Sequence, residues 1–420
     1  MNARRIYRAS HLFGIPDQRD ITEDGAIVVQ DGIAIAAGRF RELEIGANDT
    51  IEDLGDGLLL PGLVNAHTHL EFSSLEDPVG EPGIEFTQWI RLVVATRQSC
   101  STENKDLAIA RGIQESIDSG VSLVGEIATA PCNLVPYNQS DLDTTVFLEQ
   151  LGRNTATLDE LKATRTSFLR SFDTVNSEQA QTLRHRSNQL AAGMSPHAPY
   201  SVGHALLRSL IDSSKQNRLP LAMHLAETEQ ERELLESLSG PFVNLLQEFG
   251  VWDRLTFQPP MTIQDYIQAL AVLDRSLIIH GNVLRTEELD LVARHRDKMS
   301  VVFCPRTHQF FQHHRYPLNE LLQRKINVAV GTDSRASNPD LKLFEELKMI
   351  AREFPEVDEL EILRMGTRNG ALALNRMGEG FGQIEPNLRA RIAFIARPQS
   401  EGGPIRNWLF STDADCVRVL

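Results

Sequence analysis

The fold can be inferred outward from residues 59–67, LLPGLVNAH, an apolar run of strand length that ends in a histidine. Near-continuous apolar strands that alternate with helices are typical of a parallel sheet covered on both faces. Seven further runs follow along the chain: VSLVGEIA (121–128), TTVFLEQ (144–150), LAAGMSPH (190–197), LPLAMHLAE (219–227), SLIIHGN (276–282), SVVFCP (300–305) and INVAVGTDS (326–334).

Segments with helical spacing of apolar residues separate these runs, for example over 107–117, where Gly120 ends the pattern, and over 343–350. Eight strand–helix units predict an α/β protein with a (β/α)8 TIM-type barrel over residues 61–375. A doubly wound parallel sheet has the same alternation and stays open as the alternative.

The two ends of the chain have a different pattern, with β-rich pieces and turns. GAIVVQDG (25–32) and IAIAAGRF (33–40) are joined by Asp31-Gly32, a hairpin signal. After residue 376, strand-like pieces return: GFGQIEP (380–386), RARIAFIA (389–396) and ADCVRVL (414–420). We expect residues 1–60 and 376–420 to form one small discontinuous β-sandwich domain beside the barrel.

Composition narrows the function classes. The 420 residues include 57 acidic and 42 basic side chains, a net charge of −15, which argues against a nucleic-acid polymer or an anionic membrane as the partner. No apolar run approaches the ~18 residues of a membrane span, and no export signal is recognisable. Cys100, Cys132, Cys304 and Cys416 are spread without a CxxC pair, as in a reducing compartment. We expect a cytoplasmic protein with a small-molecule substrate, and a homodimer is left open.

Histidines mark the ends of the predicted strands. His67 and His69 are two residues apart, so in a strand their side chains face the same way and can meet one ion. In a parallel barrel, the strand ends converge on one mouth, where active sites lie. The remaining candidates at strand ends are His197, His224, His280 and Asp333.

Imidazole and carboxylate ligands suit Zn²⁺ or Fe²⁺, which lowers the pKa of a bound water. Glu227, three residues after His224, is placed to protonate a leaving group. Each residue also has a structural interpretation: a histidine can be a satisfied core residue, Asp333 can cap a turn, and Glu227 can be one more exposed helix charge. Their shared position at strand ends favours the metal site. The chain has no Pro-Cys-x-x-Cys, no His-Glu-x-x-His, no Gly-x-Gly-x-x-Gly and no P-loop.

Five motifs in this order resemble the amidohydrolase superfamily, and within it the cytosine deaminase-like ATZ/TRZ group, which includes S-adenosylhomocysteine, guanine and aminofutalosine deaminases and triazine hydrolases. They are LLLPGLVNAHTHLEFS (58–73), MSPHAPYSV (194–202), LAMHLAETEQE (221–231), LIIHGN (277–282) and AVGTDSRASN (329–338). The resemblance covers nearly the whole chain.

The resemblance implies one divalent metal, with zinc favoured and iron or manganese as alternatives. The implied ligands are His67, His69, His224 and Asp333. Asp333 would also act as the base, Glu227 as the proton shuttle and His280 as the residue that polarises water or substrate. His197 would contact the substrate. No lysine ends the fourth strand, so a mononuclear site is expected.

Other candidates concern the substrate. Glu71, which directly follows His-Thr-His-Leu, is expected to bind a polar group of the substrate, and arginines are candidates for binding an anionic end of it: Arg153, Arg306 and Arg335. The sequence departs from the group's usual Cys-Pro-x-Ser-Asn after the seventh strand, where a solvated loop with His308, His313 and His314 is expected.

The expected activity is that of a hydrolase of non-peptide carbon–nitrogen bonds, which deaminates a purine-like ring or nucleoside, with an aminofutalosine deaminase-like substrate favoured. A triazine-type chloro- or amino-hydrolase or an amide hydrolase is the alternative. A non-catalytic scaffold of the same fold is a remote one, because no expected ligand is missing.

Overall fold

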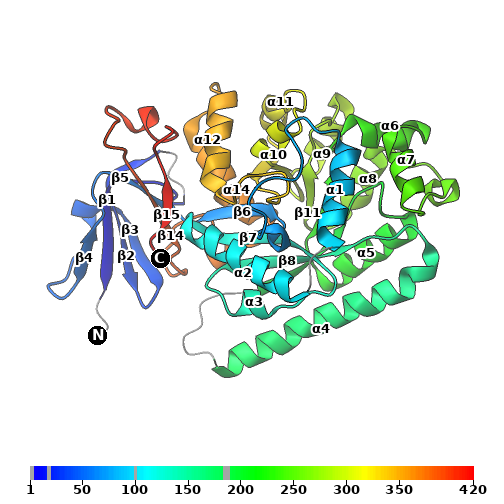
Figure 1. Ribbon diagram of the computed structural model, residues 1–420. Coiled ribbons are helices and arrows are strands. Elements are labelled where there is room, and N and C mark those ends of the chain that lie inside the picture. Colours follow the sequence, from blue (N-terminus) through cyan, green and yellow to red (C-terminus); the bar gives the residue numbers. More distant parts are fainter. Residues whose placement is uncertain (1–3, 17–19, 99–101, 183–189) are drawn as a thin grey trace.

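The computed structural model describes residues 4–16, 20–98, 102–182 and 190–420. Its largest feature is a parallel sheet of eight strands in sequential order, which curves into a barrel (Figure 1). This confirms the barrel over the doubly wound alternative, and every strand falls within one of the eight apolar runs or overlaps it. The strands are β6 (Leu63–Thr68), β7 (Val121–Thr129), β8 (Asp143–Gln150), β9 (Leu190–Pro196), β10 (Leu221–Leu225), β11 (Ser276–His280), β12 (Met299–Phe303) and β13 (Asn327–Val330).

The strands are buried on both faces, which explains their continuous apolar runs. Val64 packs inside the barrel with Leu123 and Phe147, whereas its neighbour Leu63 packs in the outer cluster with Ile113 of a covering helix. Successive side chains of a strand point to opposite faces, so one strand contributes to both cores.

The barrel closes where its first and last strands meet. Thr68 and Asp333 form a parallel bridge, and the backbone N–H groups of Thr332 and Asp333 each donate to the carbonyl of His67 at 3.1 Å. The Thr68 hydroxyl donates to the Asp333 carbonyl at 3.1 Å. The seam therefore lies at residues expected to carry the chemistry.

Helices connect the strands and cover the barrel (Figure 1). The long α4 runs along one side of the molecule in this view, and α12 lies beside the sheet formed by the two ends of the chain. The helices are α1 (Phe86–Gln98), α2 (Thr102–Asp118), α3 (Val135–Asn138), α4 (Leu158–Thr182), α5 (His204–Asn217), α6 (Glu229–Ser237), α7 (Pro241–Glu248), α8 (Ile263–Leu270), α9 (Thr286–Arg294), α10 (Pro305–Phe310), α11 (Leu318–Gln323), α12 (Leu343–Glu353), α13 (Glu359–Met365) and α14 (Arg368–Ala373).

The two ends of the chain form one mixed sheet of seven strands, in which strands from both termini are neighbours (Figure 1). β14 pairs antiparallel with β5, and β1 pairs with β4 over its first half and with β5 near its end. The strands are β1 (Arg5–Leu12), β2 (Thr22–Gln30), β3 (Ile33–Arg39), β4 (Thr50–Asp53), β5 (Gly57–Pro61), β14 (Ile392–Ala396) and β15 (Cys416–Arg418). The domain boundaries at residues 60 and 376 stay predictions.

Two local expectations have different outcomes. The hairpin at Asp31-Gly32 is present between β2 and β3, with both residues at positive φ. The expected strand over 380–386 is wrong: this segment consists of turns, since Gly380 and Gly382 adopt φ of 84° and 69°, outside the extended region.

No helix within the described residues is long and apolar enough to cross a membrane. Cys132, Cys304 and Cys416 have free thiols, and Cys100 lies outside the described residues.

Candidate metal centre

The barrel brings four of the predicted strand-end residues into one buried cluster. Nε2 of His67 and Nε2 of His69 lie 3.6 and 3.7 Å from Oδ1 of Asp333. The His224 ring lies 5.0 Å from the ring of His67 and 5.5 Å from that of His69, between centroids. His67, His69 and Asp333 offer ligand atoms within 4.8 Å of one another, and so do His67, His224 and His280. The four residues of the cluster lie on or just beyond β6, β10 and β13.

Three buried nitrogens of this cluster lack hydrogen-bond partners among the described residues. Both ring nitrogens of His67 and Nδ1 of His69 have none among the described residues. Nδ1 of His224 faces the carbonyl oxygen of His197 at 3.1 Å, which leaves its Nε2 as the one free nitrogen. Burial, together with the neighbouring histidines, lowers the pKa of His69 and lowers that of His224 to about 3. Neutral, buried and unpartnered imidazoles beside a carboxylate fit a divalent cation.

Asp333 is held in a conformation that its side chain alone does not favour. Its φ is 56°, in the left-handed region, which residues other than glycine adopt where the surroundings force it. The Ser337 hydroxyl donates to Oδ2 at 3.0 Å, and the Thr307 hydroxyl lies 3.0 Å from that of Ser337. Burial favours the neutral acid, but the neighbouring histidines, first of all His67, hold the pKa of Asp333 well below its usual range.

Glu227 and His280 form a pair next to this cluster. Oε1 of Glu227 lies 3.3 Å from Nε2 of His280, and the His280 ring is 5.4 Å from that of His224. Burial, followed by the negative charge of Asp333, raises the pKa of Glu227 well above its usual value, whereas burial lowers the pKa of His280. The arrangement supplies a carboxyl group that can hold and give a proton beside a neutral imidazole.

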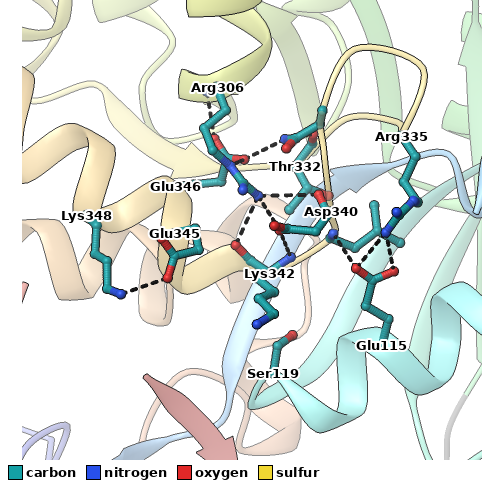
Figure 2. A network of polar contacts seen from close by, with 12 residues as sticks. Glu115, Ser119, Arg306, Thr332, Arg335, Asp340, Lys342, Glu345, Glu346 and Lys348 are labelled. Carbon is teal, nitrogen blue, oxygen red and sulfur yellow. Dashed lines mark hydrogen bonds and ion pairs between the residues drawn. The ribbon is translucent and has the colours of Figure 1, made fainter. Parts of the chain in front are cut away.

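A polar network supports the segment that follows Asp333 (Figure 2). Arg306 donates from its backbone N–H and from Nε to the carboxylate of Glu346, at 2.8 and 2.7 Å, and from Nη2 to Asp340 at 2.7 Å. Nδ2 of Asn338 joins Glu346, at 2.6 Å, to the carbonyl of Thr332, at 2.7 Å. The guanidinium of Arg306 thus pairs with two carboxylates of the protein, and its contact with substrate stays a prediction.

The other candidate arginines are also engaged by the protein. Arg335 donates to Glu115 at 2.9 and 3.1 Å (Figure 2). Arg153 lies 3.4 Å above the ring centroid of Phe257 and donates to the carbonyls of Pro199 and Val202 at 2.7 and 2.9 Å. It lines a hollow of about 1100 Å³ whose lining contains none of the clustered histidines. Arg153 thus has partners within the protein, and its contact with substrate stays a prediction.

Glu71 also has partners within the protein. Its carboxylate is in contact with Arg97, lies 3.1 Å from Nζ of Lys105 and accepts the Thr129 hydroxyl at 2.7 Å. Burial opposes ionisation, but the cations Arg97 and Lys105 lower the pKa of Glu71. The substrate contact of Glu71 stays a prediction, and Arg97, in the last turn of α1, is a residue that sequence reasoning missed.

Sequence reasoning also missed Glu149. It is the second-last residue of β8, and its Oε1 lies 3.9 Å from Nε2 of His197. Nδ1 of His197 faces the Ser201 hydroxyl at 2.6 Å. Glu149 lies at the end of a predicted strand, which is the same signal that identified the histidines and Asp333.

The histidines of the 305–316 segment differ from the expected solvated loop. His308 and His313 are partly buried, 5.4 Å apart between ring centroids, whereas His314 is exposed. Both line a hollow of about 510 Å³ together with Tyr316. Burial lowers the pKa of His308 and that of His313 to about 4.

Comparison with known proteins agrees with this arrangement. The profile described as "Amidohydrolase family" matches residues 58–419. An adenosine deaminase of Helicobacter pylori is 27% identical over 423 residues, covering 99% of this chain and 98% of the relative. An aminodeoxyfutalosine deaminase of Nitratiruptor sp. is 26% identical over 391 residues, covering 92% of this chain and 91% of the relative.

A solved structure is similar over the same extent. The crystal structure of Helicobacter pylori aminofutalosine deaminase in complex with methylthio-coformycin superposes with a TM-score of 0.78 at 26% identity, and it covers 99% of this chain and 100% of that one.

Proposed function

Because this chain belongs to the amidohydrolase family, and is an enzyme that hydrolyses carbon–nitrogen bonds, we propose that it deaminates an aminopurine nucleoside with release of ammonia. The observation that carries the proposal is the buried cluster of His67, His69, His224 and Asp333 beside the Glu227–His280 pair. The relatives that cover nearly the whole chain are deaminases of adenosine and of aminodeoxyfutalosine, which supports this substrate class.

We assign the divalent metal to the four residues of the cluster. Three imidazoles and one carboxylate suit zinc, and we propose zinc as the native ion. When bound, it would lower the pKa of a water so that hydroxide is available near neutral pH. The unpartnered nitrogens of His67 and His69 are the groups that such an ion would satisfy.

Asp333, Glu227 and His280 then divide the proton transfers. Asp333 stays ionised among the histidines, so its carboxylate can accept the proton of the attacking water. Burial raises the pKa of Glu227 and so favours its protonated form, which can deliver a proton to a ring nitrogen or to the departing amine. His280, at 3.3 Å from Glu227, would hold the water or the substrate in line by a hydrogen bond.

Ammonia release from a panel of substrates tests the proposal. The panel holds adenosine, methylthioadenosine, aminodeoxyfutalosine, adenine, an aminotriazine and a chlorotriazine, each with metal-loaded protein. We expect ammonia from at least one aminopurine nucleoside, and the aminodeoxyfutalosine arm decides whether the favoured substrate is right. Chloride release, or turnover of the triazines alone, would instead support a triazine hydrolase and refute the deaminase.

A further inference from the structure

Glu149 is one of two exceptions among the buried glutamates of the described chain. It is 4% exposed, and Oε1 of its carboxylate has no hydrogen-bond partner among the described residues. The glutamates Glu126, Glu231, Glu288 and Glu346 are equally buried, and each accepts hydrogen bonds from side-chain or backbone donors. A buried carboxylate without a donor is costly, because it has lost water and gained nothing in exchange.

The other buried glutamate without such a bond is Glu227, which we place in the chemistry. The two residues have similar surroundings: Glu227 stands beside His280 at 3.3 Å, and Glu149 stands beside His197 at 3.9 Å. His224 contacts both histidines, with ring centroids 5.4 and 5.1 Å away. The metal cluster is thus flanked by two Glu–His pairs, of which the proton transfers use only one.

A second metal ion does not explain the unused pair. Glu149, His197 and His224 offer donor atoms within 4.8 Å of one another. However, Nδ1 of His224 faces the His197 carbonyl, so His224 has one nitrogen to give. The proposed function assigns that nitrogen to the ion held with His67, His69 and Asp333. Without His224, only Glu149 and Nε2 of His197 remain, which is too few ligands for a protein-bound ion.

His197 is more exposed than the residues of the cluster, whereas Glu149 beside it is buried, with 2% of its side chain exposed. The His197 side chain is 22% exposed and that of Arg97 is 39% exposed, whereas His67 is fully buried and His280 is 3% exposed. Arg97 acts electrostatically on both Glu149 and His197 and therefore stands near them.

We propose that Glu149 is a specificity-determining residue, which accepts a hydrogen bond from an N–H or O–H group of the substrate beside His197. This inference rests on the proposed function. A carboxylate can only accept, and the ring nitrogens of an adenine-type base are acceptors as well. The donors of an aminopurine nucleoside are its sugar hydroxyls and its amino group, so these are the two possible sources of the bond.

The test compares Glu149→Ala and Glu149→Gln with the wild-type protein, using adenosine, 2′-deoxyadenosine, 3′-deoxyadenosine and adenine. Glu149→Ala removes a hydrogen bond to a charged group, so we expect kcat/KM to fall by about 10- to 150-fold. Glu149→Gln keeps an acceptor oxygen, so its loss is smaller. If the donor is a sugar hydroxyl, the loss disappears with the deoxynucleoside that lacks it; if the donor is the amine, the loss is equal for all four substrates.

Stability separates this role from a structural one. Because the Glu149 carboxylate has no partner to lose, Glu149→Gln should melt at or above the wild-type temperature and keep the same metal content. The matched control is Glu126→Gln on the neighbouring strand β7, since Glu126 accepts from the Tyr137 hydroxyl at 3.0 Å and from the Leu70 N–H at 2.9 Å. This control should lower the melting temperature.

Three results would overturn the inference. The first is that both Glu149 variants retain wild-type kcat/KM on every substrate that the wild type deaminates. The second is that Glu149→Gln melts at a temperature as low as Glu126→Gln does. The third is that Glu149→Gln loses the metal. If the wild type itself releases no ammonia from any aminopurine compound, the proposed function fails and the inference falls with it.

Discussion

Glu346→Ala tests whether the buried pair behind Asp333 carries stability. Glu346 is fully buried, and it accepts from Nε and the backbone N–H of Arg306 and from Nδ2 of Asn338. Removing one partner of a buried pair costs about 3–5 kcal/mol, because the other charge stays buried without compensation. Asp340 still pairs with Arg306 at 2.7 Å, so we expect the lower end, about 3 kcal/mol.

The neighbouring residue provides the control. Glu345 is 34% exposed and pairs with Lys348 at 2.7 Å on the same helix, α12 (Figure 2). Glu345→Ala changes helix propensity by the same amount as Glu346→Ala does. The ion pair that it breaks contributes about 0–1 kcal/mol to the free energy of unfolding.

Thermal unfolding of both metal-loaded variants gives the measurement. With about 2.1 cal/mol/K of unfolding entropy per residue, 420 residues give about 0.9 kcal/mol/K, so 3 kcal/mol lowers the melting temperature by about 3–4 °C. Glu345→Ala should shift it by about 1 °C or less. Equal shifts in the two variants, or an unchanged Glu346→Ala, would refute the reasoning.

Three further predictions concern the site. Asp333→Asn should abolish turnover while the circular dichroism spectrum stays native, and near-normal ammonia release would contradict its role as the base. Ser337→Ala removes the donor to Oδ2 of Asp333 and should weaken metal binding by about 10- to 100-fold in chelator competition, whereas an unchanged affinity would exclude that support. Burial raises the pKa of Glu231 from 4.5 to about 7, so the fold favours the protonated acid; this stabilisation is complete below pH 4.5 and is lost as pH rises to about 7. Between pH 4.5 and 8, urea unfolding should show that the free energy of unfolding of the wild type falls by about 3 kcal/mol relative to that of Glu231→Gln. Parallel pH profiles of the two proteins would disprove this prediction.

The strands and the metal cluster were predictable because their signals are local. An apolar run followed by a polar residue, as in LLPGLVNAH, specifies a buried strand and the residue at its end, and the parallel barrel brings such ends together. His67 and Asp333 could therefore be assigned to one site although no short-range pattern connects them.

The arginines could not be assigned in this way. Each arginine donates a hydrogen bond to a residue that is distant in the sequence. Arg306 donates to Glu346, 40 residues away, and Arg153 donates to Thr256, 103 residues away. Arg335 donates to Glu115, 220 residues away. The sequence around an arginine does not show whether its guanidinium binds a substrate or pairs with a buried carboxylate. Its role therefore follows only from tertiary contacts.

The seam of the barrel has a consequence for how the protein matures in a cell. His67 and His69 leave the ribosome long before Asp333, since 265 residues separate Thr68 from Asp333 across the closing bridge. At about 5–20 residues per second, synthesis of this interval takes about 13–53 s. During that time the nascent chain contains His67 and His69 without the complete set of metal ligands. The complete ligand set exists only after nearly the whole barrel has been made, so capture of the ion and closure of the barrel belong to the same late event.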